Sequence, residues 1–157
     1  METSRQWVLL AYRLPREPST PRITLWRKLK RLGAVQVLDS LAGLPFTPRT
    51  REQFEWLSQE VIEAGGEASV WLASPLSAAE ERDLTARLTS SIANDYRAVT
   101  AAAQNARSEP PLARPRTLSR LRRELRRIGE RDYVSTPERD AARAAVNGLA
   151  AASEVPV

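Results

Sequence analysis

Short runs of consecutive apolar residues alternate along the chain with longer stretches in which apolar residues recur every three or four positions. A continuous run predicts a buried strand, and the wider spacing predicts an amphipathic helix. The apolar runs predict strands over residues 6–14, 34–38 and 68–73. The stretch 39–44 either continues the second of these strands or forms another before Pro45 ends it.

Proline and glycine mark where the predicted helices begin and end. Thr20 followed by Pro21 is typical of a helix N-terminus, with Thr20 as the N-cap, and Gly33 is suited to end that helix. Thr47–Pro48 repeats the starting signal, and Ser77 opens a capping box. Helices are therefore predicted over residues 21–32, 48–64, 78–106, 117–128 and 137–150.

The order of these elements predicts the fold class. Strand, helix, one or two strands, helix, strand and helix is the order of an α+β fold in which helices cover one face of a mostly antiparallel sheet. We predict a ferredoxin-like βαββαβ domain over residues 1–106, followed by a C-terminal helical extension over residues 117–152. The segment 107–116 holds three prolines and few apolar residues, so we expect it to be a linker.

All four tryptophans lie on the apolar side of a predicted element: Trp7, Trp26, Trp56 and Trp71. We expect them to belong to the hydrophobic core rather than to a platform for stacking nucleic-acid bases.

The composition excludes several classes of function. The chain has no cysteine and no histidine, which excludes disulfides, zinc fingers, thiol nucleophiles and serine–histidine triads. It also lacks a glycine-rich phosphate loop, so we expect no catalytic residue, no cofactor and no metal site. The alternative that stays open is a nuclease or another enzyme that uses magnesium, in which Asp39 at a strand end pairs with its copy in a dimer.

The apolar segments also bear on where the protein resides. The run Trp7–Ala11 is too short for the core of a signal peptide and has no cleavage site. No segment approaches the roughly 20 apolar residues of a membrane-spanning helix. We therefore expect a cytoplasmic protein that does not contact a membrane.

Charge is distributed unevenly around the net +5 of the chain. Residues 1–51 carry a net +7, residues 52–110 a net −6 and residues 111–157 a net +4. Two predicted helices each place basic residues opposite an apolar face, and we hypothesise that these side chains contact DNA phosphates. The alternative is that both are solvated faces. The residues are Arg22, Arg27, Lys28, Lys30 and Arg31 in the first helix and Arg120, Arg122, Arg123, Arg126 and Arg127 in the later one.

A second basic group brackets the N-terminus of the first helix. Guanidinium groups and helix N-termini both bind tetrahedral oxyanions, so Arg13, Arg16 and Arg22 form a candidate oxyanion site. The alternative is that Arg13 and Arg16 form surface ion pairs with Glu17 and its neighbours.

The run from Trp7 to Arg22, followed by Leu25–Ala34, resembles the N-terminal domain of the ChrB chromate-resistance regulator family. The resemblance continues through Thr47–Arg51, Trp56–Leu57, Gly65–Ala68 and the Arg131–Tyr133 element, and so covers most of the chain. A weaker likeness to the central domain of PaaX-type repressors supports the ferredoxin-like prediction.

This resemblance implies a transcriptional regulator that binds the operator upstream of a chromate-resistance operon, with chromate as its effector. The longer family members carry a C-terminal domain, so we expect this chain to act as a homodimer or with a separate polypeptide that supplies that domain. The alternative is a standalone module that senses oxyanions or binds a partner without binding DNA.

Overall fold

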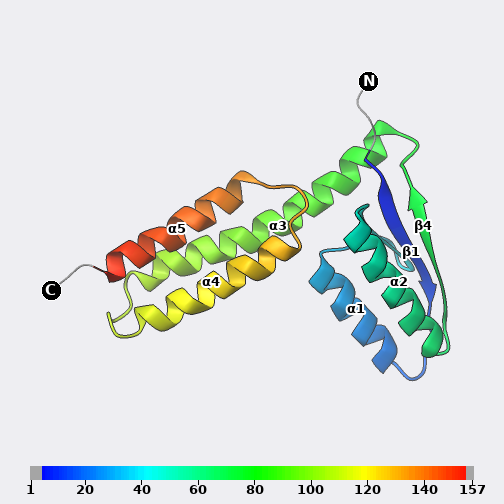
Figure 1. The fold of residues 1–157 in the computed structure, drawn as a ribbon, viewed down its shortest axis with the longest axis horizontal. Coiled ribbons are helices and arrows are strands. Elements are labelled where there is room, and N and C mark those ends of the chain that lie inside the picture. The colour runs from blue at the N-terminus through cyan, green and yellow to red at the C-terminus, as the bar shows by residue number, and fades with distance from the viewer. Residues whose placement is uncertain (1–4, 155–157) are drawn as a thin grey trace. The chain divides into compact units, whose positions relative to one another are not determined.

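β1 (Trp7–Arg13) lies inside a four-stranded antiparallel sheet whose strand order is β2-β3-β1-β4 (Figure 1). In this computed structural model, which describes residues 5–154, β2 spans Val35–Leu38, β3 spans Leu41–Pro45 and β4 spans Glu67–Ala73. α1 (Thr20–Leu32) connects β1 to β2, and α2 (Pro48–Glu63) connects β3 to β4. This is the ferredoxin-like βαββαβ arrangement, which confirms the predicted fold class and makes the stretch after Asp39 a separate strand.

Alternating burial along β1 explains how the sheet and the two helices form one core. Val8 and Leu10 are buried and lie opposite Leu44 and Ala42 of β3, so these side chains share one face of the sheet. The two helices contribute the buried residues Leu25, Leu29, Phe54, Leu57 and Val61. Trp7 points to the opposite face, where its indole N–H donates to the Glu81 carboxylate at the start of α3 (3.2 Å).

Local chemistry sets the helix ends. α1 ends at Gly33, whose φ of 79° is the left-handed conformation that favours glycine. Its N-cap is Ser19, one residue before the predicted Thr20, and the Ser19 side chain makes no capping hydrogen bond. α2 has a complete capping box, because the Thr47 hydroxyl accepts the Thr50 N–H (3.0 Å) and the Thr50 hydroxyl accepts the Thr47 N–H (2.9 Å).

α3 (Ala78–Ala106), α4 (Arg114–Glu130) and α5 (Pro137–Ser153) form the helical remainder of the chain. α4 and α5 lie alongside the C-terminal part of α3 (Figure 1). Their shared core includes Ile92, Tyr96 and Val99 from α3, Leu121 and Ile128 from α4, and Val146 and Leu149 from α5. Within the described residues 5–154, no helix combines the length and the apolar character needed to cross a membrane.

The chain divides into two compact units, one ending at Leu88 and the other beginning at Thr89. The division falls inside α3, because α3 packs against α4 and α5 from Ile92 onward. The segment 107–116, expected to be a linker, lies within the second unit and is held by side-chain hydrogen bonds. There the Arg114 guanidinium donates to the carbonyls of Glu109 (3.1 Å) and Arg107 (3.0 Å). The division into domains at 107–116 thus remains a prediction about independently folding parts of the chain.

The expectation that all four tryptophans belong to the core is wrong for three of them. Trp7 is 1% exposed, but Trp26, Trp56 and Trp71 expose 55%, 68% and 57% of their surface. On α1 the residue that faces the sheet is Leu25, and on α2 it is Leu57. Trp26 follows Leu25 and Trp56 precedes Leu57, so one helical step of 100° turns each tryptophan toward solvent. Trp71 is exposed because it lies opposite Leu9, on the sheet face that α1 and α2 do not cover, and because its strand, β4, is at the edge of the sheet.

Candidate functional site

α4 carries the strongest basic face of the structure. The helix holds seven arginines and two glutamates. Its apolar residues, Leu118, Leu121, Leu125 and Ile128, lie in or against the core of the second unit, as the spacing predicts. The opposite side exposes the predicted phosphate-binding residues Arg120, Arg122, Arg123, Arg126 and Arg127. None of these guanidinium groups forms an ion pair within residues 5–154, so their positive charge is available to an external anion.

α1 also presents its predicted basic residues, but some of them are engaged. Lys28 is half-buried and its ammonium group lies 2.8 Å from the Glu60 carboxylate of α2. The Lys30 ammonium lies 4.5 Å from the centre of the exposed Trp26 ring, within the range of a cation–π contact. The remaining basic side chains of this face are exposed: Arg22, Arg27 and Arg31.

The predicted oxyanion residues Arg13, Arg16 and Arg22 line one groove of about 800 Å³ at the N-terminus of α1. The groove forms beside the short 14–19 loop, which joins the end of β1 to the start of α1. Sequence reasoning did not place Arg27 and Trp26 here, since it assigned the first to DNA phosphates and the second to the core.

The electrostatics of this groove favour an anion. The uncapped N-terminus of α1 has no acidic residue in its first turn, so its backbone N–H groups add partial positive charge. Arg13 is paired with Glu67 at 2.6 Å rather than with Glu17, and both side chains are largely exposed. Arg16 and Arg22 form no ion pair within the described part of the chain, which leaves two free guanidinium groups beside the helix N-terminus.

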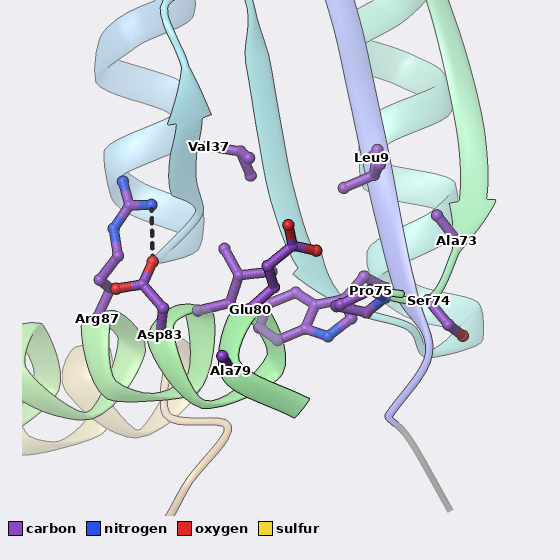
Figure 2. A pocket seen from close by; sticks show the side chains of 11 residues that line it. Leu9, Val37, Ala73, Ser74, Pro75, Ala79, Glu80, Asp83 and Arg87 are labelled. Atoms are coloured by element: carbon purple, nitrogen blue, oxygen red, sulfur yellow. Dashed lines mark ion pairs between the residues drawn. The ribbon is translucent and has the colours of Figure 1, made fainter. Parts of the chain in front are cut away.

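A smaller, mostly apolar pocket of about 520 Å³ lies on the sheet face that α1 and α2 do not cover (Figure 2). Leu9, Val37 and Ala73 come from the strands, while Ala79, Glu80, Asp83 and Arg87 come from the first turns of α3. The Arg87 guanidinium lies 3.9 Å from Asp83 and also donates to the Gln36 carbonyl. With two carboxylates and only one, already engaged, arginine in its lining, this pocket does not suit an oxyanion.

Asp39, the residue of the nuclease alternative, is exposed and lines the basic groove. Its backbone carbonyl accepts a hydrogen bond from the Tyr12 hydroxyl (3.3 Å). Among residues 5–154 no cluster of three or more metal-ligating side chains occurs.

A polar network holds the connection between α4 and α5. The buried Tyr96 hydroxyl donates to the Asp132 carboxylate (2.9 Å), and the N–H groups of Val134 and Ser135 donate to the same carboxylate (3.0 and 2.9 Å). Burial and the bond to Asp132 raise the pKa of Tyr96 to about 12. Burial alone would raise the pKa of Asp132, but the donated hydrogen bonds outweigh it and lower that pKa below its usual value.

Residues 22–110 match the family described as "Protein ChrB, N-terminal". "Protein ChrB" of Cupriavidus metallidurans is 30% identical over 90 residues, which cover 57% of this chain and 27% of that protein. The aligned part thus spans about a quarter of the length of the relative. No solved structure matches the chain. The matched residues begin at the third residue of α1 and end before α4 begins.

Proposed function

The chain belongs to the ChrB N-terminal family, and from this membership we propose that it is a non-enzymatic chromate-resistance regulator that binds operator DNA in the cytoplasm. We further propose that the operator lies upstream of a chromate-efflux operon and that chromate is the effector. The partner is a second copy of the chain or a polypeptide that supplies the part of the longer relative that this chain does not align with.

The observation that carries DNA binding is the exposed arginine face of α4. Five guanidinium groups on about two turns of helix are exposed and form no ion pairs within the described residues, so local carboxylates do not balance their charge and they are available to DNA phosphates. Contacts of this kind supply affinity rather than sequence preference, so base reading must come from other side chains. α1 offers a second, weaker surface because Lys28 and Lys30 already have partners.

Fluorescence anisotropy on DNA from upstream of the operon, over a range of salt concentrations, tests this proposal. The triple variant Arg122→Ala, Arg123→Ala, Arg126→Ala should bind more weakly, and its slope of log affinity against log salt should fall by about 0.9 for each phosphate that the protein no longer neutralises. The matched control Arg82→Ala, Arg107→Ala, Arg143→Ala removes the same charge from exposed positions outside the basic faces of α1 and α4, and it should leave the slope unchanged. An α4 variant with the wild-type slope would reject the assignment.

A second candidate function, oxyanion sensing without DNA binding, is supported by the groove at the N-terminus of α1. Arg16 and Arg22, which form no ion pair within the described residues, both line this groove beside a helix N-terminus without a side-chain cap, and these groups suit a tetrahedral dianion. Titration calorimetry with chromate and sulfate should give heat with the wild type and much less with the Arg16→Ala, Arg22→Ala variant. Arg49→Ala is the control, and no heat with either anion would reject this function.

A further inference from the structure

The two edges of the sheet are built differently. β2 is only four residues long and its pairing with β3 shifts register between Gln36 and Leu38. The Gln36 side-chain amide donates to the carbonyls of Leu38 (2.7 Å) and Asp39 (3.3 Å), and the Arg87 guanidinium donates to the Gln36 carbonyl. A short, bulged edge with covered carbonyls cannot accept another strand.

β4, at the other edge, has none of these protections. All seven of its residues pair with β1 in unbroken register, so the strand is regular along its whole length. Within residues 5–154 no strand pairs with its outer side. It contains no proline and no lysine, and its one charged residue, Glu67, stands at its first position and is bound by Arg13.

β4 also exposes large apolar side chains on both of its faces. Trp71 and Leu72 are adjacent in the strand and therefore point to opposite faces, with 57% and 55% of their surfaces exposed. A long, regular and apolar edge of this kind favours pairing with a further strand.

We propose that β4 pairs antiparallel with β4 of a second copy of this chain, so that the sheet continues across a two-fold axis. With Val70 at the axis, Trp71 lies opposite the partner's Ser69 and Leu72 lies opposite the partner's Ala68. Each large side chain thus meets a small one on its own face of the sheet. Glu67 lies opposite the partner's Ala73, which keeps the two carboxylates at opposite ends of the interface and avoids repulsion between like charges.

The same register brings the two tryptophans together. Trp71 and the partner's Trp71 become diagonal neighbours on one face, within the reach of aromatic side chains across paired strands. Self-pairing uses one surface twice and leaves no unpaired edge at β4, which is the property of a closed two-fold dimer. This interface rests on the second copy that the proposed function names as a possible partner, and it does not depend on DNA binding.

Sedimentation velocity of the full chain without DNA, over a wide concentration range, tests the interface. The wild type should be a dimer, and the Ser69→Lys, Trp71→Lys variant should weaken dimerisation by at least about 100-fold. The control Trp56→Lys, Gln59→Lys adds the same charge and removes an even more exposed tryptophan from α2, and it should remain a dimer. The triple arginine variant of α4 should also remain a dimer, which separates this proposal from the proposed DNA binding.

Hydrogen exchange of the β4 amides provides a second measurement that does not rely on a variant. Protection of residues 67–73 should increase with protein concentration as dimers form, while the amides of β2 should not respond. A wild type that stays monomeric, a dimer that the two lysines do not weaken, or a dimer without added protection in β4 would each overturn the proposal.

Discussion

At the scale of single residues, the tryptophans differ in what they contribute to stability. Trp7 is enclosed between the sheet and the start of α3, and its indole N–H has a carboxylate partner in Glu81. Trp7→Ala should therefore lower the free energy of unfolding by about 3–5 kcal/mol. Trp56→Ala removes a side chain that is 68% exposed and should cost less than about 0.5 kcal/mol. Chemical denaturation of both variants measures these values, and a large loss for Trp56→Ala would contradict its exposure.

Asp132 links single-residue chemistry to pH. Its pKa is lowered in the folded chain by the N–H groups of Ser135 and Val134 and by the Tyr96 hydroxyl, which outweigh the effect of burial. The ionised carboxylate thus favours the folded state, so its contribution is present above the ordinary pKa of 3.8 and is lost as pH falls through the lowered folded value.

Asp132→Asn should be less stable than the wild type at neutral pH by about 1–3 kcal/mol. The difference between the two proteins should shrink as the pH is lowered below about 4, where the wild-type carboxylate becomes protonated. Thermal unfolding at a series of pH values measures the difference, and a constant gap across the acid range would show that the charge of Asp132 is not the cause.

At the scale of elements, the N-termini of α1 and α2 form a matched pair. Both N-caps, Ser19 and Thr47, carry a hydroxyl group, but only Thr47 of α2 accepts a capping hydrogen bond. Thr47→Ala should cost about 1 kcal/mol of stability, within the usual range for a lost N-cap. Ser19→Ala should be nearly neutral, because Ser19 makes no such bond. Equal effects in chemical denaturation would mean that the two caps do not differ.

The sequence pattern predicts which side chains share a face of one helix or strand. It does not predict whether another element covers that face. The arc of Leu118, Leu121, Leu125 and Ile128 on α4 is found as predicted, because a single helical period determines it. Whether Trp71 is covered depends on the position of β4 at the sheet edge and on which face of the sheet the helices cover, and the local pattern of β4 contains neither.

The candidate sites follow the same rule. The arginines of α4 share one face because their spacing along a single helix places them there. The groove at α1 combines the end of β1, the first turns of α1 and the turn before β3. The positions of Arg13, Arg16 and Arg22 beside the helix N-terminus were predictable from the short connection, but Asp39 enters the groove only through the pairing of β2 with β3.

At the scale of the whole molecule, α3 belongs to both compact units, and this arrangement determines how the chain should unfold. Its first turns lie beside Trp7, while Ile92, Tyr96 and Val99 lie in the core with α4 and α5. A boundary in the 107–116 segment would instead make all of α3 unfold with the sheet. The amides of α3 after Ile92 therefore report which division the folded chain follows.

Two core substitutions distinguish these divisions by native-state hydrogen exchange. Leu10→Ala, in the sheet core, should accelerate exchange in β1, β3 and β4 but leave the α3 amides after Ile92 protected. Val146→Ala, in the core of α5, should accelerate exchange in those α3 amides and in α4, and leave the sheet protected. Leu10→Ala should lower the free energy of unfolding by about 2–5 kcal/mol, and Val146→Ala somewhat less because valine is smaller. Either loss is enough to make the affected unit exchange first. If Leu10→Ala instead accelerates exchange along the whole of α3, the independent part of the chain ends at the Pro-rich segment, and the helix unfolds together with the sheet.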